Sequence, residues 1–216
     1  MVPRTRLLLS LLCGVGCKAE SLGVEVRQGG LESLSVEDLH RDAWMFSNDL
    51  TDRGPGGGDE EMAAERLKQR LQEMKTLPGF GRAYTSRKGS GPWRSCARKE
   101  GADPDAIVWA ALDRGQGAMA GSIPRAILVS LAKAWDTYDA PPRALVFCGL
   151  AEEGGLDDYL DSPAQPLAQT RRIVTFGPMG DGELVRTDTE LRGIRLTHFT
   201  TADERIGTDE DRIEAV

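Results

Sequence analysis

The chain has 216 residues, with 27 Lys or Arg and 34 Asp or Glu, so its formal net charge is −7. Hydrophobic residues make up 40% and charged residues 28%, which excludes a disordered chain and a membrane protein with several spans. The negative charge argues against nucleic-acid binding as the main task. Four cysteines, two of them within the first 17 residues, are too few for a disulfide-rich scaffold, and 2 histidines restrict metal and nucleophile chemistry.

The N-terminus has the pattern of an export signal. Two arginines in the first six residues precede the apolar run 7–15, which is too short to cross a bilayer, because a transmembrane helix needs ~20 apolar residues. The small residues before Cys17 resemble the bacterial lipobox, in which this cysteine is lipidated. We expect a signal peptide over 1–17, lipidation at Cys17 and a glycine-containing tether over 18–33. An ordinary secretory signal, or a buried N-terminal element of a cytosolic protein, are the alternatives.

Three helices are expected in the body of the chain. The first spans 35–50, with a serine N-cap, an acidic first turn and apolar residues at helical spacing. The glycine-rich run 53–58 ends it, and a second amphipathic helix follows over 59–75. The third spans 122–138, with Pro124 in its first turn.

Strand patterns alternate with these helices. The continuous apolar runs 107–112 and 144–150 are typical of strands buried on both faces. Further strands are expected over 82–86, 93–98, 172–176, 183–186 and 193–199. This order predicts an α/β fold over 34–202, a three-layer sandwich with a largely parallel or mixed central sheet. Residues 203–216 form an acidic tail outside it.

Cys96 and Cys148 are the two cysteines of the predicted domain. In an oxidising periplasm they could pair. Both lie in apolar or strand-like surroundings, which favours the alternative of two buried free thiols.

Five motifs follow one another along the domain. The first, at 49–66, is an Arg-Gly turn before a helix that opens with Ala-Ala-Glu. The other four lie at 107–113, 117–122, 146–154 and 173–180. Their order and spacing resemble those of bacterial di-zinc aminopeptidases of metallopeptidase family 28. The resemblance implies a zinc-exopeptidase-like sandwich and zinc-dependent peptide-bond hydrolysis. The chain is shorter than the usual domain of this family, so we expect the C-terminal edge of the sheet to be rebuilt or absent.

The same resemblance implies that most of the catalytic chemistry is missing. A paired zinc site needs His and carboxylate ligands, one of which bridges both ions. When the motifs of this chain are aligned with those of the family, the first ligand His falls on Ala111 and the bridging Asp on Ala120. The next ligand falls on Pro178 or Gly177, and the general base falls on Ala151. A methyl group has no lone pair to offer a metal.

Two carboxylates remain as residual candidates for a metal. They are Asp113, which matches the residue that supports the first ligand, and Glu152, which matches a ligand. A shift of one residue would instead place Glu152 at the base position and Glu153 at the ligand position. The last ligand of the family, a histidine, has no convincing counterpart, since His198 lies in a strand-like stretch and His40 in the first helix.

The sequence therefore predicts a lipid-anchored protein of the cell envelope, facing the periplasm or in the outer membrane, or secreted if Cys17 is not lipidated. We expect a catalytically degenerate aminopeptidase-like protein without metal or other cofactor. It would bind a peptide or protein partner, or act as a scaffold, and would meet the membrane through its lipid. The alternative is a divergent zinc aminopeptidase with Glu152 or Glu153 as its catalytic residue. A structural lipoprotein without any ligand is the third possibility.

Overall fold

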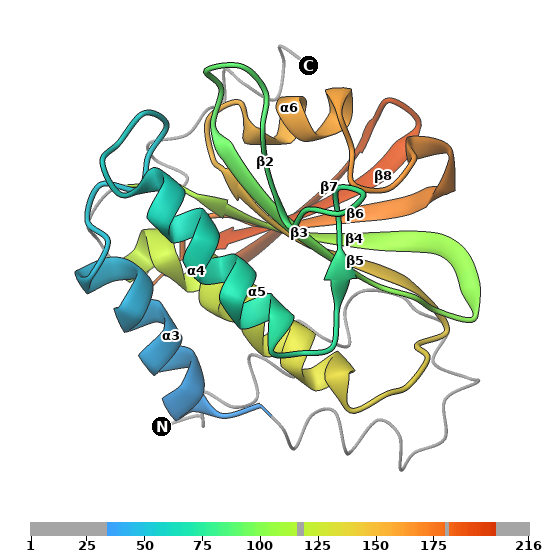
Figure 1. Cartoon of the computed structure of the whole chain (residues 1–216), viewed down its shortest axis with the longest axis horizontal. Coiled ribbons are helices and arrows are strands. Elements are labelled where there is room, and N and C mark those ends of the chain that lie inside the picture. Colours follow the sequence, from blue (N-terminus) through green and yellow to red (C-terminus); the bar gives the residue numbers. More distant parts are fainter. Residues whose placement is uncertain (1–33, 116–118, 180–181, 202–216) are drawn as a thin grey trace.

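The computed structural model describes residues 34–115, 119–179 and 182–201 (Figure 1). The predicted signal peptide with Cys17, the tether and the acidic tail lie outside the described residues. None of the helices in the described ranges combines the length and the hydropathy of a bilayer-spanning segment.

A mixed sheet of 8 strands forms the centre of the fold (Figure 1). The strands are β1 (Leu77–Pro78), β2 (Thr85–Arg87), β3 (Trp93–Lys99), β4 (Asp103–Asp113), β5 (Arg143–Ala151), β6 (Thr170–Phe176), β7 (Leu184–Leu191) and β8 (Ile194–Thr201). Their order is β1-β3-β5-β4-β6-β8-β7, and β2 also pairs with β3. The neighbouring strands β5, β4, β6 and β8 are parallel to one another, whereas β1, β2, β3 and β7 run antiparallel to their partners.

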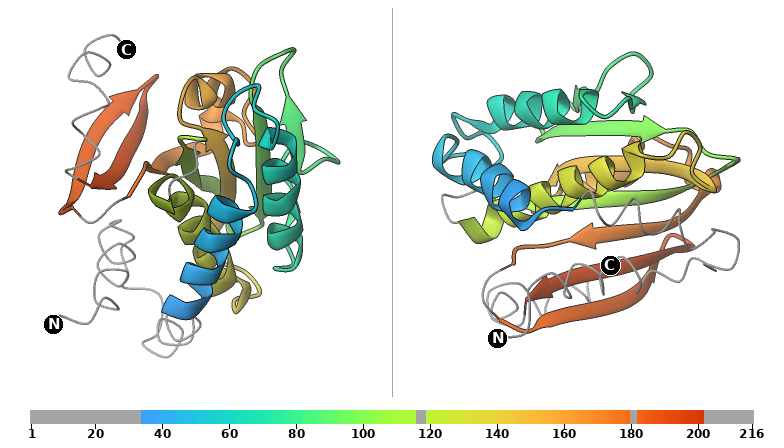
Figure 2. Two further views of the ribbon diagram at one scale, coloured as in Figure 1. Left: turned by 90° about the vertical axis from the view of Figure 1, so that its left-hand side faces the viewer. Right: turned by 90° about the horizontal axis from the view of Figure 1, so that it is seen from below.

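Helices cover both faces of this sheet (Figure 2). One face packs against α3 (Val36–Asn48), α4 (Glu60–Gln72) and α5 (Met119–Asp136). The short helix α6 (Gly155–Asp161) packs against the other face, and a 3₁₀ turn at Leu167–Gln169 follows it. The predicted three-layer α/β sandwich with a mixed central sheet is confirmed.

The central strands are apolar because both of their faces are buried. In β4, Trp109 and Ala111 point to the layer of three helices, while Val108 and Ala110 point to the α6 layer. All four residues are at most 4% exposed. Such strands read as continuous apolar runs, as the sequence predicted for β4 and β5.

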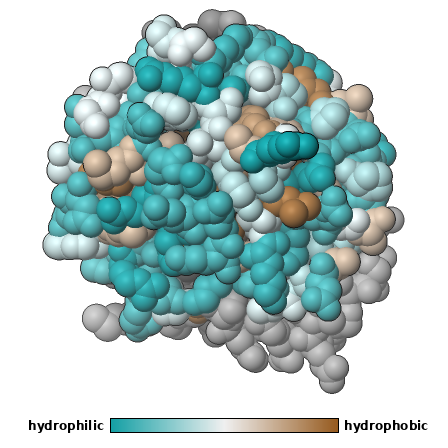
Figure 3. Space-filling view, in the orientation of Figure 1, coloured by the Kyte–Doolittle hydropathy of each residue, from teal (hydrophilic) through white to brown (hydrophobic). Residues whose placement is uncertain are grey.

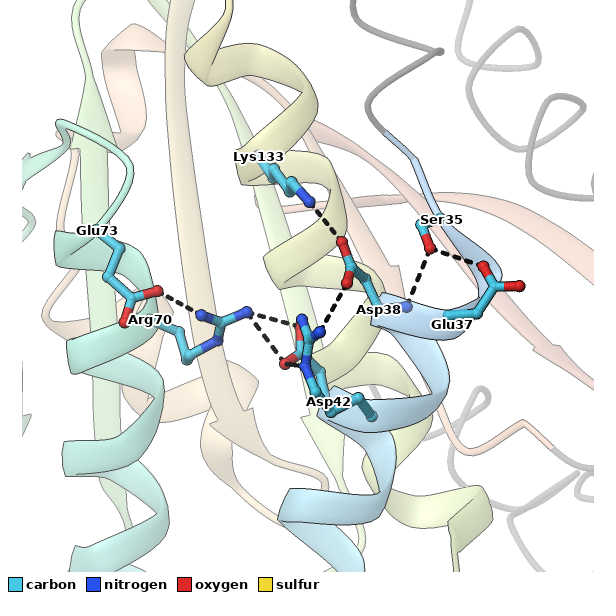
Figure 4. A network of polar contacts seen from close by, with 8 residues as sticks. Ser35, Glu37, Asp38, Asp42, Arg70, Glu73 and Lys133 are labelled. Atoms are coloured by element: carbon cyan, nitrogen blue, oxygen red, sulfur yellow. Dashed lines mark hydrogen bonds and ion pairs between the residues drawn. The ribbon is translucent and has the colours of Figure 1, made fainter.

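Polar contacts tie the three helices of one layer together (Figure 4). Ser35 caps α3, because its Oγ accepts a hydrogen bond from the backbone N–H of Asp38 at 3.2 Å. The carboxylate of Asp38 in turn accepts a hydrogen bond from Lys133 of α5. Both carboxylate oxygens of Asp42 lie 3.1 Å from Nη2 of Arg70 in α4. The first helix is thus held to each of its two neighbours by a charged pair.

The expectation of two free thiols at Cys96 and Cys148 is wrong, because the two residues form a disulfide. They are direct partners in the antiparallel pairing of β3 with β5, and their Cα atoms are 4.2 Å apart. Directly opposite residues of an antiparallel pair bring their Cβ atoms within disulfide reach.

The bounds of several elements also differ from the predicted ones. Helix α5 begins at Met119, three residues earlier than expected, so that Pro124 lies inside the helix. The antiparallel hairpin of β7 and β8 forms the C-terminal edge of the sheet, and both strands extend to longer ranges than predicted.

Candidate functional site

The predicted site residues gather where the parallel strands end. Asp113 is the last residue of β4, and its Cα partner in β5 is Ala151, which Glu152 follows directly. The backbone N–H of Glu152 donates to the carbonyl oxygen of Asp113 at 2.9 Å. In open α/β sheets, ligands bind at this carboxyl edge. The structure therefore brings the two residual metal-ligand candidates to neighbouring positions.

Asp113 is shared between two buried arginines. Nε of Arg53 donates to Oδ2 of Asp113 at 3.0 Å, and Nη2 of Arg53 donates to Oδ1 at 3.3 Å. Nε of Arg125 lies 2.7 Å from the same Oδ2. The backbone N–H of Gly115 also donates to Oδ1, at 2.8 Å. Asp113 and Arg53 are each 2% exposed and Arg125 is 4% exposed, so solvent does not screen these contacts.

Arg125 is the least satisfied member of this cluster. Its Nε forms an ion pair with Asp113, and its Nη1 has no hydrogen-bond partner within the described ranges. Burial lowers the pKa of Arg125, and the charge of Asp113 opposes that shift. The guanidinium carbon also lies 5.7 Å from the centroid of the Phe46 ring. A cation–π contact and an ion pair together hold this charge in the interior.

Glu60 is the second buried carboxylate near this cluster. It is 6% exposed, and its negative charge also favours the charged form of Arg125. Oε2 of Glu60 accepts from the backbone N–H of Gly56 at 2.8 Å, and Oε1 accepts from that of Trp93 at 2.7 Å. Glu60 therefore links the glycine-rich turn to the start of β3. With Glu60 included, two buried carboxylates balance two buried guanidinium groups.

Glycines bring Arg53 to its position. The backbone N–H of Arg53 donates to the carbonyl oxygen of Gly115 at 2.7 Å. Gly115 has a φ of +81°, and a Cβ atom there would lie 2.2 Å from Cα of Gly54. A side chain at this position would therefore suffer both backbone strain and a backbone clash. The Arg-Gly turn of the sequence is required for packing against the end of β4.

Glu152 and Glu153 differ in their surroundings. The carboxylate of Glu152 accepts from Nε of Arg114 at 3.2 Å, and its side chain is 18% exposed. Glu153 is exposed to solvent. The structure thus gives Glu152 a cationic partner and not a second carboxylate.

The positions at which the family resemblance places a metal ligand or the general base lie at the same edge of the sheet or close to it. Ala111 and Ala151 are buried, and Gly177 and Pro178 follow β6. The side chain of Ala120 lies outside the described part of the structure.

The two histidines are on separate elements. His198 lies in β8, where its Nδ1 is 2.8 Å from Oγ1 of Thr175. His40 lies in α3 and stacks on Trp44 with ring centroids 6.4 Å apart. Neither histidine is joined to Asp113 or Glu152 by a contact among the described residues.

Arg125 and Glu60 were not recognised from the sequence as parts of the site, and Arg53 was recognised only as part of a turn motif. A weak signal was available for Arg125. It is the one charge between residues 119 and 132, a stretch that is otherwise apolar or small, and a charge in such a helix is a candidate for burial with a partner.

No protein-family model matches the sequence, and no curated protein matches it either. Solved structures do share its fold. A Zn-dependent exopeptidase from Parabacteroides distasonis matches with a TM-score of 0.56 at 9% identity, over 69% of this chain and 63% of that chain. The LapA aminopeptidase of Legionella pneumophila matches with a TM-score of 0.53 at 16% identity, over 71% of this chain and 45% of that chain.

A glutaminyl cyclase from Bacteroides thetaiotaomicron matches with a TM-score of 0.54 at 9% identity, over 72% of this chain and 66% of that chain. The chain therefore spans less than two thirds of the length of each of these three structures. At these identities the likeness establishes a zinc-exopeptidase-like fold.

The residues that the structure describes at the carboxyl edge do not fit a zinc ion. A zinc ligand must offer a free lone pair, and structural or catalytic zinc takes at least three protein ligands. Both carboxylate oxygens of Asp113 are already held by guanidinium groups, and Glu152 is paired with Arg114. Two buried positive charges beside Asp113 would also repel a divalent cation. Over the described part of the chain, no group of three His, Cys, Asp or Glu side chains is placed to hold a metal.

Proposed function

We propose that the protein is an exported, lipid-anchored, catalytically degenerate member of metallopeptidase family 28 that acts by binding a partner or by scaffolding. The observation that carries the proposal is the carboxylate of Asp113, which two buried guanidinium groups share at the carboxyl edge of the sheet. In a metal centre this carboxylate would support a metal ligand. Here it is part of an internal charge network instead.

The electrostatics of the site support a non-catalytic role. Peptide hydrolysis by a zinc enzyme needs an activated water and a general base beside the metal. The best-placed carboxylate for that base is Glu152, which is paired with Arg114 at 3.2 Å. This contact commits one carboxylate oxygen of Glu152 to Arg114.

The disulfide supports export. Disulfides persist in the periplasm and outside the cell, whereas the cytosol keeps most thiols reduced. The Cys96–Cys148 bond joins two buried residues of the central sheet. This agrees with the predicted signal peptide and with lipidation at Cys17.

The accessible surface favours a polar mode of partner binding. The face that Figure 3 presents is mainly hydrophilic, and its apolar areas are small and separate. Among the described residues, only Val36, Trp44, Met62 and Leu77 are large hydrophobic side chains that are exposed. A large apolar interface is therefore not expected on this face. A peptide or protein partner would be held here mainly by hydrogen bonds and charges.

Zinc stoichiometry tests the degenerate site. The purified protein is exposed to zinc, desalted and measured by elemental mass spectrometry, and we expect no retained zinc. Aminopeptidase substrates should be hydrolysed no faster by the wild type than by the Glu152→Ala variant. Two zinc ions per chain, or activity that Glu152→Ala abolishes, would refute the proposal.

Lipid labelling tests the anchor separately. In bacteria fed a radiolabelled fatty acid, we expect label on the wild-type chain and none on the Cys17→Ser variant. An unlabelled protein in the culture medium would favour secretion, and an unlabelled protein in the cytoplasm would refute export.

A divergent zinc-dependent aminopeptidase is the second candidate function. It is favoured by the position of Glu152 at the carboxyl edge and by the exopeptidase and aminopeptidase neighbours. The zinc measurement separates the two candidates, because only the enzyme requires a bound metal.

A further inference from the structure

The described part of the chain has one long strand edge that no further strand covers. It belongs to β7, which pairs with β8 alone and lies at the end of the sheet (Figure 2). β7 has 8 residues, without a proline or a break in its register, whereas β1 and β2 beside β3 have only 2 and 3 residues. Natural sheets usually shorten or interrupt their edge strands, because a long edge offers backbone groups to another strand. The β7 edge is therefore a candidate surface for association.

We propose that the outer edge of β7 pairs with β7 of a second copy of this chain, antiparallel and with Thr187 on the two-fold axis. The two sheets then form one continuous sheet across the dimer. This proposal does not rest on the proposed function, because it involves neither the carboxyl edge of the parallel strands nor the N-terminal segment.

The turn after β7 determines which backbone groups face outward. Leu191 and Ile194 are Cα partners across Arg192 and Gly193, whose φ values of 51° and 78° suit a type I′ turn. Residues that flank such a turn are hydrogen-bonded to each other, and hydrogen-bonded and non-hydrogen-bonded pairs alternate along an antiparallel ladder. The backbone N–H and C=O groups of every second residue of β7 therefore face away from β8. These residues are Leu184, Arg186, Asp188 and Glu190.

Arg186 and Asp188 give this edge a self-complementary pattern of charges. Nη2 of Arg186 lies 2.7 Å from Oδ2 of Asp188 on the same face of β7, and both residues are exposed. Oγ1 of Thr197 in β8 donates to Oδ1 of Asp188 at 2.6 Å, which holds the carboxylate at this edge. When two copies pair about Thr187, Arg186 of each copy lies directly opposite Asp188 of the other. Each of the four charges then has opposite charges as its nearest neighbours.

The same charges disfavour the neighbouring registers. An axis at Arg186 or at Asp188 places that residue opposite its own copy, and an axis at Thr189 places Asp188 opposite Glu190. Like charges directly opposite each other destabilise a pair of strands, whereas opposite charges and Thr–Thr pairs stabilise it. Of these four positions, only an axis at Thr187 avoids like charges in opposite positions. The sequence of β7 thus specifies one register for its own association.

Sedimentation velocity of the full-length chain with Cys17→Ser, which carries no lipid, measures the association. A standard interface buries about 800 Å² per partner, and one strand edge from each copy provides less. We therefore expect a weak dimer in equilibrium with the monomer, with a dimer fraction that increases up to millimolar concentrations.

Charge reversal tests whether the β7 edge forms the dimer. Arg186→Asp places like charges opposite each other on both sides of the axis, so it should weaken dimerisation by about tenfold or more. Arg186→Asp combined with Asp188→Arg restores the opposite charges and should restore the dimer. Arg82→Asp makes the same change of net charge at an exposed residue outside this edge and should leave the association unchanged.

A cysteine on the axis tests the register. Cα atoms of a non-hydrogen-bonded antiparallel pair are about 4.5 Å apart, a distance that a disulfide can bridge. Thr187 forms such a pair with its own copy, so Thr187→Cys should give a covalent dimer on mild oxidation. The two copies of Thr189 are about 13 Å apart along the strands, so Thr189→Cys should not. Serine replaces both cysteines of the first 17 residues in these variants, which leaves the new thiol as the only one outside the disulfide.

The proposal is overturned by a chain that stays monomeric at every concentration. It is also overturned by a dimer that Arg186→Asp leaves intact, since the copies then meet through another surface. A dimer that Thr187→Cys does not cross-link, or that Thr189→Cys cross-links equally well, overturns the register.

Discussion

Arg125 reaches from the second turn of α5 to within 2.7 Å of Asp113 at the end of β4, and Arg53 contacts the same carboxylate oxygen at 3.0 Å. A helix, a strand end and a glycine-rich turn therefore meet at one buried atom. Because two positive charges share one carboxylate, removing any member of the cluster leaves a buried charge of the others uncompensated.

Removing Arg125 should cost far more than removing a surface arginine. Arg125→Met leaves Asp113 in the interior with only one guanidinium, and breaking a buried pair costs about 3–5 kcal/mol. The control is Arg192→Met, since Arg192 pairs with Asp161 on the surface and such pairs contribute about 0–1 kcal/mol. Urea denaturation of both variants measures the difference. Equal losses would mean that Arg125 contributes little to the buried network.

Acid should weaken the contact between α3 and α5. The hydrogen bond from Lys133 holds the pKa of Asp38 below its ordinary value, which is about 3.9. A depressed carboxyl pKa contributes stability that is complete above about pH 4–5 and is lost as the pH falls through the folded-state pKa. Because the pair is partly exposed, we expect Lys133→Met to cost only about 0.5–1 kcal/mol at pH 7.

The difference between Lys133→Met and the wild type should shrink below about pH 4, since the protonated carboxyl no longer forms the ion pair. Denaturation at a series of pH values gives this curve. Arg82→Met, which removes a positive charge from an exposed residue, is the control and should show no such convergence. A difference that stays constant with pH would show that Lys133 acts through packing alone.

Loss of the Cys96–Cys148 bond should destabilise the protein strongly. The bond joins residues 52 positions apart, and the chain-entropy model gives about 4 kcal/mol for a loop of this length. We expect the double variant Cys96→Ala/Cys148→Ala to unfold at lower urea concentrations. Dithiothreitol should shift the wild-type transition towards that of the double variant and leave the variant unchanged. A wild-type transition that does not respond to reductant would contradict the disulfide.

Gly115 should tolerate alanine less well than Gly193. Both have positive φ values, +81° and +78°, so both substitutions place a side chain in the left-handed region at about 1–2 kcal/mol. Only at Gly115 would the new Cβ meet backbone, because nothing lies within 4 Å of that position at Gly193. We expect Gly115→Ala to cost about 1–3 kcal/mol more in urea denaturation. Equal costs would mean that the turn around Gly54 moves freely.

Local patterns were sufficient to predict much of the fold. The N-cap and apolar spacing of 35–50 predicted a helix, and α3 spans Val36–Asn48. The apolar runs at 107–112 and 144–150 lie within β4 and β5, because a strand buried on both faces needs apolar side chains throughout. Their alternation with helices was enough to predict a sandwich, since parallel strands require a crossover.

The partners in the site could not be predicted in this way. Asp113 was expected at a strand end, and it lies there. Its partners, Arg53 and Arg125, come from elements whose approach depends on the whole fold. The pairing of Cys96 with Cys148 depends on strand register, since a shift of one residue would turn one sulfur to the opposite face. Register and tertiary approach are properties of the assembled sheet.

The disulfide also makes the two edges of the sheet unequal in their resistance to local unfolding. It fastens β3, and with it the attached β1 and β2, to the parallel strands through β5. At the other end, β7 is held in the sheet by β8 alone within the described ranges. We expect local opening of the oxidised protein to start at the β7 edge and to travel inward, so amide protons there should exchange with solvent before those of β3. A reducing environment would release the second edge and let the sheet open from both directions.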